Sequence, residues 1–339
     1  MSIRDAIRTI DDAGSQICLI VDDEETLIGT VTDGDIRRAI LAGHDIEETI
    51  DDIMNLKPAT ARPEDSPQMI AAMMQKLRLR QIPVVDSSGR VNELALQGEI
   101  GGSVGNRTNI VVLMAGGLGT RLHPLTIETP KPLLTVGNRP LLETILQEFS
   151  MQGFSQFRMC VNFKAEMIED YFGGGERWGV EIKYLREPKK SGTVGGLRHL
   201  DDRPDAPIIV MNGDLLTKIN YQHLLDFHAQ NDAIATMCVR EYEWQIPFGV
   251  VELDRNQLTR ITEKPKHTSF VNAGIYVLEP ELLDRIPEDG TYDMTTLFQD
   301  AVEKRENVVA FPIREYWLDV GYEDDLVKAR GEFGEVFSE

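Results

Sequence analysis

The sequence predicts an α/β protein, in which a mostly parallel mixed sheet is flanked by helices and is preceded by a small α+β unit. Three observations lead to this prediction. Strand-like runs alternate with helical stretches from about residue 109 onward, which is typical of a parallel sheet with helices on both faces. An imperfect repeat fills the first hundred residues, and a stretch rich in Gly, Ser and Asn follows it. We therefore expect a repeat unit over 1–100, a linker over 101–108 and a larger unit over 109–339.

The composition is that of an ordinary soluble protein. The chain has 339 residues, 42% of them hydrophobic, and its apolar runs are too short for a membrane span. Its formal net charge of −21 opposes binding to nucleic acid or to an anionic membrane, because the long-range field repels phosphate. The three cysteines lie far apart, and the N-terminus lacks an apolar signal core. These features predict reduced thiols in a cytoplasmic protein.

The repeat has an offset of 64 residues, since Ile20-Val21-Asp22 recurs as Val84-Val85-Asp86. Each copy follows an amphipathic helical stretch, at 3–10 and at 67–77. A helix–strand–turn–strand–helix unit of this size cannot bury both its faces, so the two copies are expected to pack together.

In the larger part, hydrophobic spacing predicts the elements in order. Strands are expected over 109–114, 157–161, 179–185, 208–211 and 233–239, and helices over 140–151, 165–172, 221–230 and 323–333. The segment 249–277 is richer in strand-like stretches and is expected to form a local antiparallel patch. In such sheets ligands gather at the carboxyl ends of the strands.

The first of these strands runs into a glycine-rich loop, Ala115-Gly116-Gly117-Leu118-Gly119-Thr120-Arg121. Glycines let the backbone approach an anion closely and adopt positive φ, so that successive N–H groups turn toward phosphate oxygens. Arg121 and Lys131 add fixed positive charge. A dinucleotide fingerprint requires a glycine where Leu122 stands, and a P-loop requires Lys-Ser or Lys-Thr after its last glycine. The loop therefore predicts a nucleoside triphosphate site of another kind.

The run G-G-x-G-T-R-L-x-P-x-T from Gly116, followed by P-K-P-L-L from Pro130, resembles the signature of the sugar-1-phosphate nucleotidyltransferases. The resemblance covers about residues 109 to 330. It implies a Rossmann-like sheet of the nucleotide-diphospho-sugar transferase type. It also implies an enzyme that converts a nucleoside triphosphate and a sugar 1-phosphate into a nucleotide sugar and pyrophosphate.

The resemblance assigns the charged residues of the site. Arg121 is expected at the β and γ phosphates, and Lys131 near the α-phosphate and the incoming sugar phosphate. An aspartate after a strand is often only a turn or cap residue. The contexts of Asp214 (Gly-Asp) and Asp319 (Trp-Leu-Asp-x-Gly), however, match the two metal-binding aspartates of the family. Carboxylates suit Mg²⁺, which commonly binds one or two of them together with substrate phosphates.

The same resemblance supplies the remaining site residues. Nucleotide binding is expected from Ala115, Gly116, Gly117, Gly119 and Thr120 of the loop, and from Gly192 and Thr193 of the segment S-G-T-V-G-G. That segment resembles the L-G-T-A-G of the family, and Ser191 in place of Leu leaves the base contact open. Sugar binding is expected from Gly249, Glu263, Lys264, Asn272 and Gly274.

The N-terminal repeat resembles a tandem of CBS domains. Thr32 and Asp35 stand where that family's T-x-x-D contacts an adenine nucleotide, whereas the second copy has no Thr-x-x-Asp after Val91. At most one regulatory nucleotide site is expected, and a unit that only assembles or supports the enzyme is an equal alternative.

Together these features favour a Mg²⁺-dependent transferase that acts on amino-hexose, mannose or heptose 1-phosphate for surface glycans, with GTP as the donor. We also expect a homo-oligomer. Thymidylyl or uridylyl transfer to a hexose 1-phosphate is the alternative. A hypothesis of another class is a sensor that binds nucleotide without turnover, but the joint presence of Arg121, Lys131, Asp214 and Asp319 argues against it.

Overall fold

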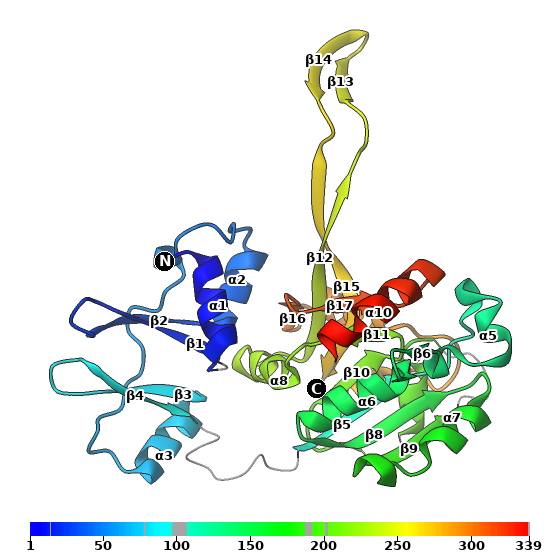
Figure 1. Cartoon of the computed structure of the whole chain (residues 1–339), viewed down its shortest axis with the longest axis horizontal. Coiled ribbons are helices and arrows are strands. Elements are labelled where there is room, and N and C mark those ends of the chain that lie inside the picture. Colours follow the sequence, from blue (N-terminus) through cyan, green and yellow to red (C-terminus); the bar gives the residue numbers. More distant parts are fainter. Residues whose placement is uncertain (14, 78, 97–106, 187–191, 201–202, 338–339) are drawn as a thin grey trace. The chain divides into compact units, whose positions relative to one another are not determined.

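The computed structural model describes residues 1–13, 15–77, 79–96, 107–186, 192–200 and 203–337. The chain forms two compact units, Met1–Asn106 and Arg107–Glu339 (Figure 1). Most of the expected linker and Ser191 lie outside the described residues. The first strand of the second unit begins at Arg107, two residues before the start expected from the sequence.

The first unit contains two β-hairpins and the helices that accompany them. Its elements are α1 (Ile3–Ala13), β1 (Ile17–Val21), β2 (Leu27–Thr32), α2 (Asp33–Leu41), a short 3-10 helix (Ile50–Asp52), α3 (Pro67–Leu77), β3 (Gln81–Val85) and β4 (Val91–Leu96). Strand β1 is antiparallel to β2, and β3 is antiparallel to β4. Each copy of the repeat has its own buried core, one around Ile3 and Val31 and the other around Met74 and Ile82.

The two hairpins close with the same turn. A side-chain oxygen of Asp22 accepts hydrogen bonds from the backbone N–H groups of Glu24 and Thr26, and Asp86 accepts the equivalent bonds from Ser88 and Arg90. The turns also contact each other, since the N–H of Leu27 donates to the carbonyl of Gly89 at 3.0 Å. The copies therefore share their local structure and lie side by side, as the repeat predicts.

In the described part of the second unit, seven strands form one sheet and six further strands lie outside it. Its strands are β5 (Arg107–Met114), β6 (Thr135–Val136), β7 (Arg139–Pro140), β8 (Phe154–Val161), β9 (Glu181–Arg186), β10 (Ile208–Asn212), β11 (Leu215–Thr217), β12 (Ala235–Gln245), β13 (Val250–Asp254), β14 (Gln257–Thr262), β15 (Lys266–Leu278), β16 (Val308–Pro312) and β17 (Trp317–Asp319). Its helices are α5 (Leu125–Glu128), α6 (Leu141–Met151), α7 (Ala165–Phe172), α8 (Tyr221–Gln230), α9 (Met294–Glu303) and α10 (Glu323–Val336), with short 3-10 helices at Thr120–Leu122, Lys131–Leu133, Glu176–Trp178, Gly195–His199 and Pro280–Arg285.

The sheet has the order β16-β12-β15-β10-β5-β8-β9. Strand β5 is parallel to β8 and β10, β8 to β9, and β12 to β16, whereas β15 is antiparallel to both of its neighbours. The predicted mostly parallel mixed sheet is confirmed. Since β5, β8, β9 and β10 run in one direction, the loops that follow them leave at a common edge.

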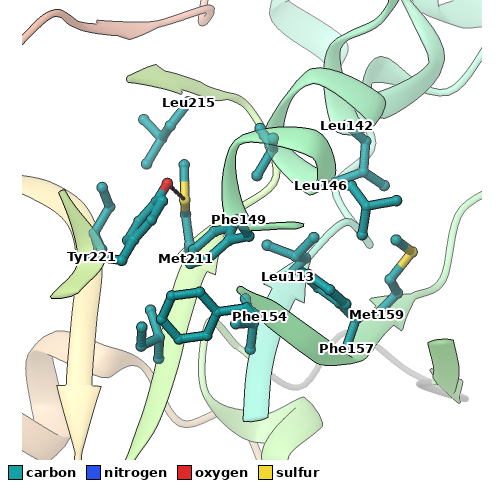
Figure 2. Close-up of a cluster of buried hydrophobic side chains, with 14 of the residues drawn as sticks. Leu113, Leu142, Leu146, Phe149, Phe154, Phe157, Met159, Met211, Leu215 and Tyr221 are labelled. Carbon is teal, nitrogen blue, oxygen red and sulfur yellow. Dashed lines mark hydrogen bonds between the residues drawn. The ribbon is translucent and has the colours of Figure 1, made fainter. Parts of the chain in front are cut away.

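Apolar residues alternate between the two faces of β5, as the pleat of a strand requires. Val111 and Leu113 belong to a core that includes residues of α6, α7 and α8. Figure 2 shows the part of this core around Phe149 and Tyr221, whose stacked rings have centroids 3.6 Å apart. Ile110 and Val112 face a second core that includes residues of α9. Both faces of the sheet are therefore covered by helices.

Two strands extend beyond the sheet. Strands β12 and β15 continue as a two-stranded ribbon, and the hairpin β13–β14 follows at its end (Figure 1, yellow). We call residues 241–272 the arm. The sequence predicts strands in this segment but not their projection from the sheet, because alternation of side chains carries no information on where a ribbon lies. No helix among the described residues is both long and apolar enough to cross a membrane.

Candidate active site

The ends of β5 and β10 approach each other closely at the common edge. The N–H of Gly213 donates to the carbonyl of Met114 at 2.9 Å. A Cβ at position 213 would lie 2.8 Å from that carbonyl oxygen, closer than real Cβ atoms come. Glycine is therefore required at this position, and it brings Asp214 next to the start of the glycine-rich loop.

The glycine-rich loop is anchored at both ends. The N–H of Ala115 donates to the carbonyl of Cys160 in β8 at 2.9 Å, and the hydroxyl of Thr126 donates to the carbonyl of Gly119 at 2.8 Å. Gly119 has a φ of 63°, in the left-handed region that favours glycine. Within the loop, Gly117 and Thr120 are exposed and Gly116 is half-buried, so this backbone is open to a ligand.

Lys131 lies directly across from Asp214. Its ammonium nitrogen is 2.5 Å from Oδ2 of Asp214, and both side chains are largely covered, with 13% and 31% of their areas exposed. The other oxygen, Oδ1, is buried and has no hydrogen-bond partner among the described residues. This oxygen is therefore a candidate metal ligand.

Asp319 is brought beside Asp214 by the pairing of two short strands. Strand β17 is antiparallel to β11, with Asp319 opposite Leu215, and the N–H of Val320 donates to the carbonyl of Asp214 at 3.0 Å. Asp319 keeps one side open to solvent, and protein atoms remove water from its other sides. This desolvation, followed by repulsion from Asp214, raises the pKa of Asp319 to about 6, although Lys131 and Arg121 act in the opposite direction.

Arg121 lies within electrostatic reach of Asp319, and its guanidinium is 5.4 Å from the ring centre of Tyr322. Tyr322 precedes α10, and its N–H donates to the carboxylate of Asp325 at 2.8 Å. Asp325 also contributes to the raised pKa of Asp319. The structure thus brings Arg121 to the same site as both aspartates.

Gly192 and Thr193 lie after β9, at the same edge of the sheet. The N–H of Thr193 donates to Asp293 at 3.0 Å, and the hydroxyl of Thr193 accepts from the N–H of Met294 at 2.8 Å. Gly192 has a φ of 87°, and a Cβ there would lie 2.3 Å from the carbonyl oxygen of Tyr292. These contacts fix the segment against the start of α9. A 3-10 helix at Gly195–His199 follows this segment.

The expected sugar-binding residues fall into two groups. Gly274 packs next to β10, since a Cβ there would lie 2.7 Å from the amide of Asn212, and its N–H donates to the side chain of Asn272. Gly274 therefore lies against Asn212 and Leu215, the neighbours of Asp214, and Asn272 lies beside Gly274. Gly249, Glu263 and Lys264 lie on the arm, where the hairpin β13–β14 joins the ribbon (Figure 1). The structure does not bring this second group to the aspartates, and a role in sugar binding remains a prediction for all five.

In the first unit, Thr32 and Asp35 contact each other at the start of α2. The N–H of Asp35 donates to the Thr32 hydroxyl, and the N–H and hydroxyl of Thr32 donate to Asp35 at 2.8 and 2.6 Å. This reciprocal arrangement is a capping box, which satisfies backbone groups at the helix start. The residues expected to contact a nucleotide therefore have a structural role, and nucleotide binding remains a prediction.

The donor set at Asp214 and Asp319 fits a magnesium ion. Mg²⁺ prefers oxygen ligands and commonly uses one or two protein carboxylates, with water and substrate phosphates completing an octahedron. The buried, unpartnered oxygen of Asp214 has the chemistry of such a ligand. No cluster of three or more His, Cys, Asp or Glu side chains suited to a metal occurs in the described part of the chain. The other ligands of an ion at this position would be water molecules and substrate phosphates.

Three residues of the site were not expected from the sequence. Gly213 sets the approach of β10 to the loop, Tyr322 lies against Arg121, and Asp325 adds negative charge near Asp319. A signal for the last two was available, because both lie within six residues of Asp319 at the start of a predicted helix.

The chain thus has an α/β domain with a glycine-rich loop, two cations and paired carboxylates at one edge of its sheet. Comparison with known proteins specifies the family. The nucleotidyl transferase profile matches residues 110–335, and the CBS domain profile matches residues 1–42 and 50–92. The chain therefore belongs to the nucleotidyl transferase family, and the resemblance seen in the sequence is confirmed, including the N-terminal CBS pair.

Curated relatives and solved structures agree with this assignment. The chain is 32% identical over 224 residues to a mannose-1-phosphate guanyltransferase of Yarrowia lipolytica, a match that covers 64% of this chain and 61% of the relative. It is 32% identical over 232 residues to the mannose-1-phosphate guanylyltransferase catalytic subunit beta of Drosophila melanogaster, covering 66% and 62%. The structure of HddC from Yersinia pseudotuberculosis superposes with a TM-score of 0.53 at 24% identity, over 66% of this chain and 99% of HddC, and shows the same fold.

Proposed function

We propose that this chain is a Mg²⁺-dependent sugar-1-phosphate nucleotidyltransferase. A phosphate oxygen of the sugar 1-phosphate attacks the α-phosphorus of a nucleoside triphosphate. The bond from the α-phosphorus to the oxygen that bridges it to the β-phosphorus breaks, and pyrophosphate leaves with that oxygen. The products are a nucleotide sugar and pyrophosphate.

The observation that carries this proposal is the convergence of Arg121, Lys131, Asp214 and Asp319 beside an open glycine-rich loop. Both reactants are anions, and two unit charges 5 Å apart repel by about 3 kcal/mol at an effective dielectric near 20. A catalyst of this reaction must cancel that repulsion and align the two phosphates, with little covalent chemistry to perform. The site has the cations and the metal-binding carboxylates that this task requires.

Each charged residue has a distinct role in this proposal. The loop from Ala115 to Thr120 binds the triphosphate through its backbone N–H groups. The Arg121 guanidinium stabilises the negative charge that develops on the departing pyrophosphate. Lys131 binds the α-phosphate and the incoming sugar phosphate, and it exchanges its contact with Asp214 for one with phosphate when substrate binds.

Asp214 and Asp319 are the residues that would hold the magnesium ion. When bound, the ion would neutralise phosphate charge and make the α-phosphorus more electrophilic. The two aspartates come from different segments that the β11–β17 pairing and the Val320–Asp214 hydrogen bond hold together. Their spacing is thus set before any ligand arrives.

For the donor and acceptor we favour GTP and a mannose-type 1-phosphate. The curated relatives in the comparison are named mannose-1-phosphate guanyltransferases, and HddC was solved with GMP-PN. The matched region covers only 61% and 62% of those relatives, and HddC shares only the fold at this identity. An amino-hexose or heptose 1-phosphate as acceptor, and dTTP or UTP as donor, are therefore included in the test.

The test is a measurement of pyrophosphate release by the full chain with GTP, dTTP and UTP, each combined with mannose, glucose, glucosamine and heptose 1-phosphates. We expect release that requires both substrates and MgCl₂, with the highest kcat/KM for GTP. Binding of GTP by calorimetry without pyrophosphate release in any combination would support the sensor hypothesis instead. Release with dTTP or UTP but not with GTP would support the proposed reaction and would show that the donor is not GTP.

A further inference from the structure

The arm has no buried residue from Glu241 to Asn272. It nevertheless contains large apolar side chains, all at least 45% exposed: Tyr242, Trp244, Phe248, Val251, Leu253, Leu258 and Ile261. Soluble monomers rarely expose apolar residues in such density, and contiguous patches of this kind mark interaction surfaces. The arm therefore has the surface of an element that packs against something.

The strand register assigns each of these side chains except Phe248 to a face of the ribbon or of the hairpin. Residues directly opposite each other on paired strands share a face of the ribbon. Tyr242 pairs with Ser269, and Trp244 pairs with His267. The rings of Trp244 and His267 stack with their centroids 4.6 Å apart. Between these two pairs, Glu243 pairs with Thr268 and points to the opposite face.

The hairpin β13–β14 follows the same rule. Val251 pairs with Ile261 and, after a bulge, Leu253 pairs with Leu258, so these four side chains lie on one face. Glu252 pairs with Arg260 on the other face. An alternation of apolar and polar faces is the pattern of a sheet with one side covered.

Two ion pairs lie on the polar faces, one on the ribbon and one on the hairpin. Lys266 donates to Glu243 at 2.8 Å, and Arg260 lies 3.7 Å from Glu252. Covering the apolar faces would leave both ion pairs in water, so neither pair would have to be desolvated. A two-stranded ribbon is also only marginally stable in water without a packing partner.

We propose that the apolar faces of the ribbon and of the hairpin lie on one side of the arm and form an interface between two copies of this chain, with the arm of one copy packed on the arm of the other around a two-fold axis. A two-fold interface requires a self-complementary surface, and an apolar face can meet that requirement by packing on its own copy. The exposed apolar side chains offer on the order of 700 Å² per copy, close to the roughly 800 Å² per partner of a stable complex. Apolar faces of two ribbons pack at the usual distance between sheets.

The test compares two double variants of the full chain. Trp244→Ser with Ile261→Ser removes apolar contacts, and Glu243→Ser with Arg260→Ser is the matched control one position away on the polar face. By size-exclusion chromatography with light scattering, we expect the apolar-face variant to have half the mass of the wild type, and the control to keep the wild-type mass. Circular dichroism checks that both remain folded.

A second measurement does not depend on disrupting the arm. Cys18, Cys160 and Cys238 are all buried, so a Leu253→Cys variant offers one accessible thiol. A short bis-maleimide is expected to link two chains through this thiol, and a Thr268→Cys control on the polar face is expected to give few linked chains. A wild type that is a single chain at all concentrations, an apolar-face variant with unchanged mass, or equal crosslinking of both Cys variants would overturn the proposal.

Discussion

Lys131 and Asp214 are joined by a 2.5 Å contact that uses one oxygen of the carboxylate and leaves the other buried without a hydrogen-bond partner among the described residues. The cost of burying an unpartnered carboxylate oxygen is considerable unless a ligand compensates for it. In the proposed reaction, the ammonium group of Lys131 would bind phosphate and the unpartnered oxygen of Asp214 would bind the metal ion. The pair therefore connects phosphate binding to metal binding.

Asp214→Asn is expected to lower kcat for pyrophosphate release by at least a hundredfold, because an amide is a weak magnesium ligand and carries no charge to balance Lys131. The fold should survive, since the amide is nearly the same size as the carboxylate. The assay is pyrophosphate release at saturating MgCl₂. Asp254→Asn, at an exposed position of the arm, is the control and should behave as the wild type; equal rates for all three proteins would remove Asp214 from the metal site.

The raised pKa of Asp319, about 6, predicts how activity depends on pH. The protonated carboxyl group cannot bind a metal ion, so protons and Mg²⁺ compete for it. Between pH 7 and pH 5, activity at low MgCl₂ should fall by roughly tenfold per pH unit below the pKa. Saturating MgCl₂ should shift this fall to lower pH, and a profile that is independent of MgCl₂ would contradict the assignment.

The same group predicts an effect on stability. A carboxyl group whose pKa is raised by folding is destabilising when ionised, so its cost is present above pH 6 and disappears as the pH falls toward the ordinary value near 4. Asp319→Asn should therefore stabilise the metal-free protein at pH 7.5 by about 1 kcal/mol, a figure reduced for solvent screening of this exposed group. Urea unfolding at pH 7.5 and at pH 4.5 is the measurement. If Asp319→Asn raised the free energy of unfolding equally at both pH values, the electrostatic cause would be excluded.

The sequence was most informative where local pattern determines structure. Helices α7 and α8 have the predicted bounds because their apolar spacing is clear and their ends are marked, for example by Asn220, which accepts the N–H of His223. Arg121, Lys131 and the two aspartates could be predicted only by resemblance, since 83 residues separate Lys131 from Asp214. Their convergence depends on the order of strands in the sheet, which periodicity does not encode.

The arm shows the opposite case. The alternation in 249–277 predicts strands, and the structure has them, but the position of Glu263 relative to Asp214 depends on whether the ribbon lies against the sheet or extends from it. That choice is made by long-range packing rather than by local propensity. Likewise, the motif Thr32-x-x-Asp35 fits both a nucleotide contact and a helix cap, and only the hydrogen bonds reveal the cap.

Tyr322→Ala is expected to raise KM for the triphosphate about threefold to tenfold while changing kcat less. Its ring lies 5.4 Å from the Arg121 guanidinium, a contact worth about 1 kcal/mol at an exposed site. Tyr322→Phe keeps the aromatic face and should restore the wild-type KM. If the Phe and Ala variants have the same KM, the ring does not position Arg121.

Thr32→Ala is expected to destabilise the N-terminal unit by about 1 kcal/mol, since it removes the hydroxyl that accepts from the Asp35 N–H in the capping box. Thr32→Ser keeps this hydroxyl and should be close to the wild type.

If the unit also binds a regulatory nucleotide through Thr32 and Asp35, calorimetry of the full chain with ATP, AMP and GTP will show heat that Thr32→Ala abolishes and Thr32→Ser retains. GTP heat from the transferase site is separated by repeating the titration with Asp214→Asn. The absence of any heat dependent on Thr32, together with the loss of stability in the alanine variant, would assign this pair to the helix cap alone.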